Sequence, residues 1–375
     1  MADTLPIIRA AAVQAAPVFL DREATTEKAC ALIRNAGEQG AQLIGFPEGF
    51  IPAHPLWFHM YGATDPIASD FSTALFLNAV EVPGPEVNAL AAAARDAGAY
   101  VVIGVCEKLP GTLGTMYNTQ VYLSPEKGYI GKHQKLVPTA GERLVHDRGA
   151  GNTFGTFETA FGPGSSMMCT ENANPLAVFA LTAEQTRWHV MSWPNYFPRT
   201  GPSMPEVSLI VARAFAYMSK AYVISACGVI NDTIRDRLGV TDEIAAFLAD
   251  PTVTGGSAII APDTSVIAGP IPGDREDIVC ADLDLEASVR LKLRHDFAGH
   301  YNRSDVFQLQ VNRFTPQLTE TVEIAPALPS VIHVDGEPSV TGPPGALTGG
   351  DAADGADGDT SPPDETGGSE AEAAN

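Results

Sequence analysis

The chain alternates between short apolar runs, rich in β-branched residues, and longer segments with an amphipathic spacing. The first pattern is typical of buried strands and the second of helices. We therefore predict an α/β fold with helices at 22–39, 86–97, 204–219 and 286–294. The predicted strands are 7–13, 42–46, 100–105, 119–123, 166–169, 189–192, 222–226, 257–261 and 278–282. Alternation alone does not distinguish a doubly wound sheet from a barrel or a sandwich.

The C-terminal region departs from this pattern. From residue 336 onward the sequence is rich in Gly, Pro, Asp and Glu and has almost nothing apolar. Such a composition does not offset the entropy of ordering, so 336–375 is predicted to be a disordered acidic tail. Its role is either solvation or the regulation of assembly. We expect residues 311–335 to pack on the body or on a neighbouring subunit through the apolar side chains of Ile324, Leu328, Val331 and Ile332.

Composition narrows the class of protein. The 375 residues are 45% hydrophobic and 7% aromatic, as in an ordinary globular protein with a substantial core. The first residues lack a signal-peptide pattern, and no apolar run is long enough to span a membrane, so we predict a cytoplasmic protein. Five widely spaced cysteines without a Cys-x-x-Cys pair indicate neither a disulfide framework nor a thiolate metal site.

The net charge of −22 is concentrated at the C-terminus. No Lys or Arg follows Arg313, whereas 12 Asp and Glu residues do. A moderately acidic body with an acidic tail argues against binding to nucleic acids or anionic membranes, which requires clustered basic residues. We therefore expect a small-molecule substrate.

Cys169 is the first candidate for chemistry. It ends the apolar run 166–169 (SMMC), and polar residues follow it (TEN). Open α/β folds place reactive groups at strand ends, beside the backbone N–H groups of the next turn. A single cysteine in this position is nevertheless more often a buried packing residue than a nucleophile.

Two upstream segments carry charge in apolar surroundings. Glu48 lies in 45–50 (GFPEGF), directly after a predicted buried strand, where desolvation would raise its pKa toward that of a proton acceptor. Lys135 lies in 131–139 (GKHQKLVPT), and Glu142 follows seven residues later. Taken alone, Glu48 could be a rim ion-pair partner, and the lysine segment an exposed connection.

Taken together, these motifs resemble the nitrilase superfamily of carbon–nitrogen hydrolases. The matching segments are 46–48 (FPE), 133–139 (HQKLVPT) and 169–172 (CTEN), in the family's order. Residues 296–307 (DFAGHYNRSDVF), together with 255–257 (GGS) and 260–262 (IAP), are similar to signatures of the nitrilase branch. The resemblance extends from about residue 7 to residue 307.

The resemblance implies a four-layer α-β-β-α sandwich, with a domain at 1–310. It implies hydrolysis of an organic nitrile to a carboxylic acid and ammonia through a thioimidate and a thioester. By the same resemblance Cys169 is the nucleophile, Glu48 the proton acceptor, Lys135 the residue that stabilises charge, and Glu142 the residue that orients lysine and water or substrate. No cofactor or metal is implied. The implied partners are the nitrile, water and further copies of the chain, in a dimer-based homo-oligomer that extends in some relatives into a spiral or filament.

Two positions depart from the branch pattern. Thr170 stands where tryptophan is usual, and Ser304 where proline is common. The Thr170 backbone N–H is a candidate oxyanion donor, and its small side chain is expected to influence the partition between acid and amide. His133 and His300 lie within motifs but are expected to be structural. The alternatives are an amidase or a cyanide hydratase or dihydratase of the same superfamily and, in another class, a catalytically silent assembly protein.

Overall fold

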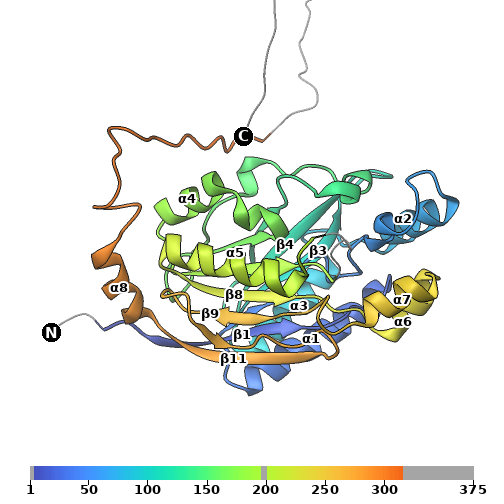
Figure 1. Cartoon of the computed structure of the whole chain (residues 1–375), viewed down its shortest axis with the longest axis horizontal. Helices are drawn as coiled ribbons and strands as arrows, with labels where there is room; N and C mark the ends of the chain where they lie inside the picture. The colour runs from blue at the N-terminus through green and yellow to red at the C-terminus, as the bar shows by residue number, and fades with distance from the viewer. Residues whose placement is uncertain (1–3, 196–200, 316–375) are drawn as a thin grey trace, which may run out of the picture. The chain divides into compact units, whose positions relative to one another are not determined.

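Two β-sheets lie face to face, and helices cover the outer side of each, in a computed structural model of the chain (Figure 1). The structure describes residues 4–195 and 201–315. The described part is therefore a four-layer α-β-β-α sandwich, as predicted from the family resemblance.

The first sheet has the strand order β11-β1-β2-β3-β4-β5. The central pairs β1–β2 and β2–β3 are parallel, whereas β11, β4 and β5 pair with their neighbours in antiparallel fashion. The carboxyl end of β2 lies beside Val102 of β3, because Gly45 pairs with that residue. The strands are β1 (Ile7–Gln14), β2 (Leu43–Gly45), β3 (Tyr100–Lys108), β4 (Met116–Ser124), β5 (Gly128–Gln134) and β11 (Asp277–Asp284).

The second sheet has the order β10-β9-β8-β7-β6. Strands β6, β7 and β8 are parallel, and their residues are buried throughout, as parallel strands covered on both faces require. Their carboxyl ends therefore lie at one edge of the sheet. The strands are β6 (Gly164–Met168), β7 (Trp188–Trp193), β8 (Tyr222–Cys227), β9 (Ala258–Ile260) and β10 (Val266–Ala268).

Separate apolar clusters join the layers. Helices α1 (Arg22–Glu38) and α3 (Pro85–Ala97) pack on the first sheet, and α4 (Pro175–Ala183) and α5 (Met204–Ser219) pack on the second (Figure 1). Side chains such as Val102, Val190 and Ile224 fill the space between the sheets. Each of these helices therefore buries apolar side chains against a sheet.

Capping residues fix where these helices begin and end. The Asp21 side chain accepts a hydrogen bond from the Ala24 N–H at the start of α1. Ser203 and Glu206 form a capping box at the start of α5. Lys220 ends that helix in the left-handed conformation, with φ of 57°. Helix α5 therefore has the bounds predicted from the sequence.

A further apolar cluster closes one end of the sandwich. It joins α2 (Pro66–Asn78), α6 (Asp232–Leu238) and α7 (Asp242–Ala249), which lie beyond the strands in Figure 1, to Phe19 and Trp57. The last described helix, α8 (Leu285–Arg294), follows β11.

Most predicted elements are present, with two kinds of error. Strand β5, strand β10 and helices α2, α4, α6 and α7 were not predicted, because their apolar pattern is weak, short or, in α4, apolar on nearly every side. The predicted strand 166–169 extends one residue too far. β6 ends at Met168, and Cys169 begins a 3-10 turn instead.

The predicted C-terminal regions fall mostly outside the described residues. The tail 336–375 and the apolar residues expected to anchor 311–335 lie beyond residue 315. The beginning of that extension does contact the body, because Arg313 forms an ion pair with Glu184 and the Asn312 carbonyl lies close to Gly151. The division at 310 stays a prediction.

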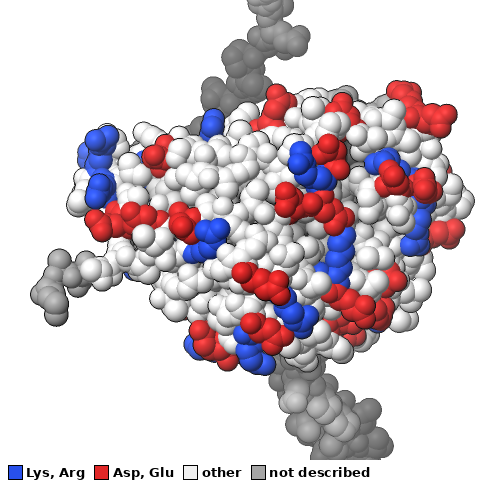
Figure 2. Space-filling view, turned by 90° about the horizontal axis from the view of Figure 1, so that it is seen from below, with Lys and Arg blue, Asp and Glu red and all other residues white. Residues whose placement is uncertain are grey.

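None of the helices in the described residues is long and apolar enough to cross a membrane. On the face shown in Figure 2, basic and acidic side chains are interspersed. The ion pairs among the described residues include Arg9–Asp282 and Lys28–Glu276.

Candidate active site

The structure brings together the charged residues singled out in the sequence. Glu48 follows β2, Lys135 follows β5, and Glu142 lies in a 3-10 turn at Ala140–Leu144. The Lys135 Nζ is 2.6 Å from Glu48 Oε1 and 2.7 Å from Glu142 Oε2. All three side chains are almost fully buried, with at most 3% of each exposed. A buried ammonium held between two carboxylates is a specific arrangement, since each buried charge is costly unless it is paired.

Asn118 on β4 joins the two carboxylates. Its Nδ2 donates to Glu48 Oε1 at 2.7 Å and to Glu142 Oε1 at 2.6 Å. Its backbone carbonyl also accepts a hydrogen bond from the Lys135 N–H at 2.8 Å. Asn118 therefore fixes the position of the lysine backbone and holds the two acidic side chains close together.

Glu142 is held by further donors. The Thr139 N–H donates to Oε2 at 2.8 Å, and His146 Nδ1 lies 3.2 Å from Oε1. Burial by itself would raise the pKa of Glu142, but the Lys135 ammonium and His146 outweigh it and hold that pKa well below its usual value. Glu142 is therefore a permanent negative charge that orients Lys135.

Glu48 differs from Glu142 in its proton affinity. Burial raises the pKa of Glu48 to about 7, against the opposing effect of Lys135 and with a further rise from Glu142. Its Oε2 is buried and has no hydrogen-bond partner among the described residues. A carboxylate with a pKa near neutrality and one uncommitted oxygen is suited to accept and return a proton.

Cys169 faces this charged cluster from the second sheet. It is 5% exposed, begins the turn Cys169–Ala173 and has a φ of 50°, in the left-handed region. Burial and the charge of Glu48 raise the pKa of Cys169 to about 12, while Lys135 and the Thr170 backbone oppose that rise. The sulfur therefore carries its proton at rest, and it would need a nearby base to remove that proton before it could act as a nucleophile.

The turn that carries Cys169 is held by neutral hydrogen bonds. Asn172 Nδ2 donates to the Cys169 carbonyl at 2.8 Å, and Asn172 Oδ1 accepts from His189 Nε2 at 2.7 Å. His189 Nδ1 then accepts from Ser165 Oγ at 2.7 Å, so the imidazole is neutral with its proton on Nε2. This chain of buried groups keeps the cysteine in its left-handed conformation.

Glu171 links this turn to the segment of the lysine. Its Oε1 accepts from the Leu136 N–H at 2.6 Å, and its Oε2 lies 3.2 Å from both the Met168 N and His133 Nε2. Cys169 and Lys135 are therefore placed relative to each other through one carboxylate. His133 has the structural role expected for it, whereas His300 is exposed at the surface.

Comparison with known proteins agrees with this geometry. The carbon–nitrogen hydrolase family model matches residues 9–292. "Nitrilase 2" from an unknown prokaryotic organism is 38% identical over 80% of this chain and 91% of its own length. "Aliphatic nitrilase" from Sinorhizobium fredii (strain HH103) is 37% identical over 81% of this chain and 95% of its own length. This chain belongs to the nitrilase branch of the carbon–nitrogen hydrolase family.

A solved structure extends the likeness to the fold. The carbon–nitrogen hydrolase from Helicobacter pylori G27 aligns with a TM-score of 0.62 at 17% identity, over 80% of this chain and 97% of that one. At this identity the likeness concerns the sandwich alone.

Thr170 lies at the surface of the protein, in the turn that begins at Cys169. Its side chain is exposed and lines a hollow of about 270 Å³ with Leu136, Val137, Arg143 and other residues of the neighbouring turns. Thr170 and Glu171 of the turn that begins at Cys169 line the hollow, so a larger side chain at position 170 would reduce it. The oxyanion role of the Thr170 N–H and its effect on products remain predictions.

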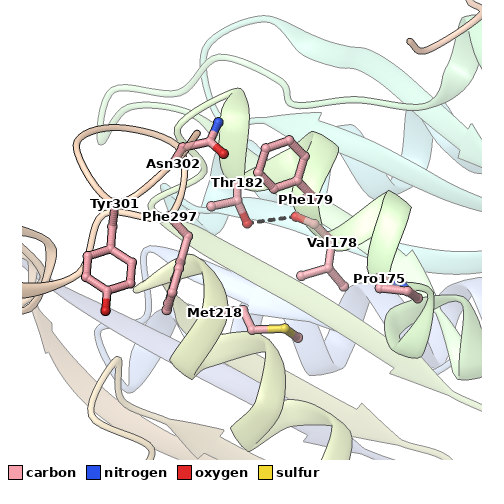
Figure 3. Close-up of a pocket in the computed structure, with 8 residues that line it drawn as sticks. All are labelled: Pro175, Val178, Phe179, Thr182, Met218, Phe297, Tyr301 and Asn302. Carbon is pink, nitrogen blue, oxygen red and sulfur yellow. Dashed lines mark hydrogen bonds between the residues drawn. The ribbon is translucent and has the colours of Figure 1, made fainter. Parts of the chain in front are cut away.

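The late signature of the nitrilase branch lies elsewhere. Phe297, Tyr301 and Asn302 follow α8 and line an apolar pocket against α4 and Met218 of α5 (Figure 3). None of the charged residues of the Glu48–Lys135–Glu142 cluster lines this pocket. The residues of this signature therefore contact helices α4 and α5 and do not contact the Glu48–Lys135–Glu142 cluster through this pocket.

One group of described residues has the spacing of metal ligands. Ligand atoms of Glu48, His54 and Glu142 all lie within 4.8 Å of one another. The Lys135 ammonium already contacts both carboxylates, however, and a divalent cation between them would be repelled by it. The cluster is therefore better suited to hold the lysine than a metal.

Several residues that position the charged cluster were not predicted from the sequence. Asn118 lies in a run of polar residues (118–120) inside an otherwise apolar strand, and that interruption is a signal for a buried polar site. His146 is four residues after Glu142, a spacing that places both side chains on one side of a helical turn. Asn172 lies in the matched segment 169–172, but its contact with His189, which joins separate segments, has no local signal.

Proposed function

We propose that the protein hydrolyses an organic nitrile to the carboxylic acid and ammonia, with Cys169 as the nucleophile. The observation that carries this proposal is the buried Lys135 ammonium between Glu48 and Glu142, next to the cysteine at a strained turn. The relatives named nitrilase favour a nitrile over other carbon–nitrogen bonds. Each partner of the cysteine has a chemical task that its surroundings support.

The first step forms a covalent bond to sulfur. Glu48 removes the thiol proton while the sulfur attacks the nitrile carbon, and a proton is delivered to the nitrogen, which gives a thioimidate. A nitrile carbon is a weak electrophile, so the negative charge that develops on nitrogen requires a nearby cation. Lys135 provides it, because its two carboxylate neighbours overcome the effect of burial and raise its pKa well above the usual value. Fixed charges of this kind typically contribute about 2.7–4 kcal/mol.

Two molecules of water complete the reaction. The first adds to the thioimidate carbon, and protonation of the nitrogen then expels ammonia and leaves a thioester. The second adds to the thioester, the carbon–sulfur bond breaks, and the acid departs while the sulfur regains its proton. Glu48 accepts a proton from each water and passes it on, a role that fits a carboxyl group with a pKa of about 7.

The test is a substrate panel. Propionitrile, benzonitrile, phenylacetonitrile, the corresponding amides and cyanide would each be incubated with the purified full chain, and ammonia, acid and amide would be measured. The proposal predicts ammonia and acid from at least one nitrile, with little turnover of amides. Release of ammonia from amides alone would indicate an amidase, formamide from cyanide would indicate a cyanide hydratase, and an inert protein would indicate an assembly role.

We also propose that the chain associates into homo-oligomers through α4 and α5. Leu176, Ile210 and Met218 on these helices are 62%, 66% and 37% exposed, next to the apolar pocket of Figure 3. Apolar side chains gathered on one face are a feature of surfaces that are buried by association. Light scattering during size-exclusion chromatography would test this, because Ile210→Glu should then lower the measured mass.

The cytoplasmic location expected from the sequence also stays a proposal. Fractionation of cells that express a tagged chain would test it directly.

A further inference from the structure

His54 is buried beside the reacting carboxylates and has no role in the scheme above. It is 7% exposed, and one of its ring nitrogens lies within 4.8 Å of a carboxylate oxygen of Glu48 and of one of Glu142. Its Nδ1 is buried without a hydrogen-bond partner among the described residues. A buried polar atom left unpaired costs about 1–3 kcal/mol, so such an atom in a native protein calls for a specific partner.

The backbone holds His54 in this place. The His54 carbonyl accepts a hydrogen bond from the Leu56 N–H at 2.9 Å, and the preceding carbonyl, that of Ala53, accepts one from Cys106 Sγ at 3.2 Å. Gly49, with φ of 55°, packs so closely that an added Cβ would lie 3.2 Å from the His54 Cα. The imidazole is therefore fixed against the loop that carries Glu48.

Burial keeps the His54 ring neutral. Burial lowers the pKa of His54 to about 3, although Glu142 opposes this effect; Lys135, His146 and His59 act in the same direction as burial. A neutral imidazole has one nitrogen that accepts a hydrogen bond and one that donates. Glu48 contributes a second acceptor, since its Oε2 is buried and unpaired among the described residues. A ring nitrogen of His54 and a carboxylate oxygen of Glu48 within 4.8 Å of each other can each accept one hydrogen of a single water, at about 2.8 Å from each acceptor.

We propose that His54 and Glu48 together bind the water that hydrolyses the covalent intermediates on Cys169. This inference rests on the proposed nitrile hydrolysis and assigns to His54 the positioning of its second reactant. The water donates one hydrogen to Glu48 and the other to the imidazole, so its lone pairs are left to face the carbon bound to sulfur.

The step balances without any further reactant. With the thioester, the water oxygen bonds to the acyl carbon while Glu48 takes one proton, and the carbon–sulfur bond then breaks. The electron pair leaves with sulfur, which takes the proton back from Glu48, so the acid and the thiol are the products. The imidazole stays neutral throughout.

The test separates formation of the covalent adduct from its hydrolysis. The fastest nitrile among propionitrile, benzonitrile and phenylacetonitrile is mixed with the wild type and with His54→Phe, and intact mass is followed with time after acid quenching. Phenylalanine fills the same space without a ring nitrogen. We expect adduct formation at a rate close to that of the wild type, hydrolysis slowed about 100-fold, and accumulation of the adduct in the variant.

Two further variants sharpen the result. His54→Asn places an amide oxygen near the position of Nδ1 and should restore hydrolysis to within about tenfold of the wild type. It also keeps the test available if the phenylalanine variant does not fold. His300→Phe, at an exposed position, should leave both rates unchanged.

The inference is wrong if His54→Phe turns over without adduct accumulation, or if adduct formation and hydrolysis slow equally, as general damage to the site would cause. It is also wrong if a folded His54→Asn variant hydrolyses no faster than His54→Phe. If the wild type itself forms neither adduct nor ammonia from any nitrile, the proposed function fails, and this inference fails with it.

Discussion

The two sheets hold their reacting groups in different ways. On the first sheet, Glu48 and Lys135 are held by charge and by hydrogen bonds to a neighbouring carboxylate and an amide. Next to the second sheet, Cys169 is kept in a left-handed conformation by neutral hydrogen bonds that lead through Asn172 to His189. Both sets are buried, yet only the first changes its charge near neutral pH.

This difference indicates that the two sets of residues have separate roles. We call the set around Glu48 and Lys135 the charged half of the site, and the set around Cys169 the neutral half. The charged half sets when protons move, because its carboxylates have very different proton affinities although both contact one ammonium. The neutral half sets where the sulfur lies, because its hydrogen bonds end on the carbonyl of the nucleophile itself. Substitutions in the two halves should therefore differ in their effect on pH dependence as well as on rate.

The largest effect is expected where the halves meet. Cys169→Ala should abolish the release of ammonia from every nitrile, because no other group can form the covalent intermediate. The side chain is small, so the midpoint of thermal unfolding should stay close to that of the wild type. Cys280→Ala, at a half-buried cysteine on β11, is the matched control and should keep full activity. Ammonia release by the Cys169→Ala variant would refute the assignment.

Removing a charge from the first half should have the next largest effect. Lys135→Ala, Glu48→Gln and Glu142→Gln should each lower kcat by about 10²–10⁴-fold, as expected for charge stabilisation and proton transfer. The losses should not add in double variants, because the residues act as one unit. Lys127→Ala, at an exposed lysine, serves as the control in the same kinetic assay. Full activity of Glu48→Gln would remove the proposed proton acceptor.

The pH dependence of the two halves offers a sharper comparison. Burial raises the pKa of Glu48 to about 7, and only its ionised form accepts a proton, so kcat/KM should fall about tenfold per pH unit below that value. Asn118→Leu removes a hydrogen bond that favours the ionised form. The pKa of Glu48 should therefore rise, and the acid limb of the profile should move to higher pH.

His189→Phe is the corresponding change in the neutral half. Phenylalanine keeps the stacking on Phe215, whose ring centroid lies 4.0 Å from that of His189, but loses both hydrogen bonds. We expect kcat to fall about tenfold at all pH values, with the midpoint of the acid limb unchanged. Equal shifts of the midpoint in both variants would show that the two halves are not separate.

The smallest predicted effect concerns Thr170. Its exposed side chain borders the hollow beside the nucleophile, and tryptophan would fill much of that space. Since about 1.4 kcal/mol changes a partition tenfold, Thr170→Trp should change the ratio of amide to acid or the preferred size of nitrile by a few-fold. Chromatography of the products from the nitrile panel would measure both. Identical ratios and rankings would show that the side chain takes no part.

The sequence was sufficient for most of the fold, whereas the catalytic roles of Cys169, Glu48, Lys135 and Glu142 stay predictions. The buried strands and the helices α1, α3 and α5 follow from apolar spacing and caps that are local in sequence. The meeting of Glu48, Lys135 and Glu142 was expected from family motifs rather than from any spacing, and their contacts confirm that they are neighbours.

Other parts of the site depend on contacts that local patterns do not encode. Cys169 was expected at the end of a strand, but its left-handed conformation is imposed by hydrogen bonds from β7 and from the turn after it. Helix α4 lacks an amphipathic signature because nearly all of its residues are apolar, including the exposed Leu176. His54 lies between Pro52 and Pro55 in a segment without a helix or strand pattern, so its proximity to Glu48 was not predicted.

The central claim, a covalent bond between the nitrile carbon and the sulfur of Cys169, is tested most directly by trapping that bond. The wild type would be mixed with its best nitrile, quenched in acid within the first turnover, digested, and mapped by mass spectrometry. The account predicts added mass on the peptide that contains Cys169, which disappears as acid and ammonia form. Turnover with every cysteine-containing peptide unchanged, or with the added mass on another cysteine, would contradict it.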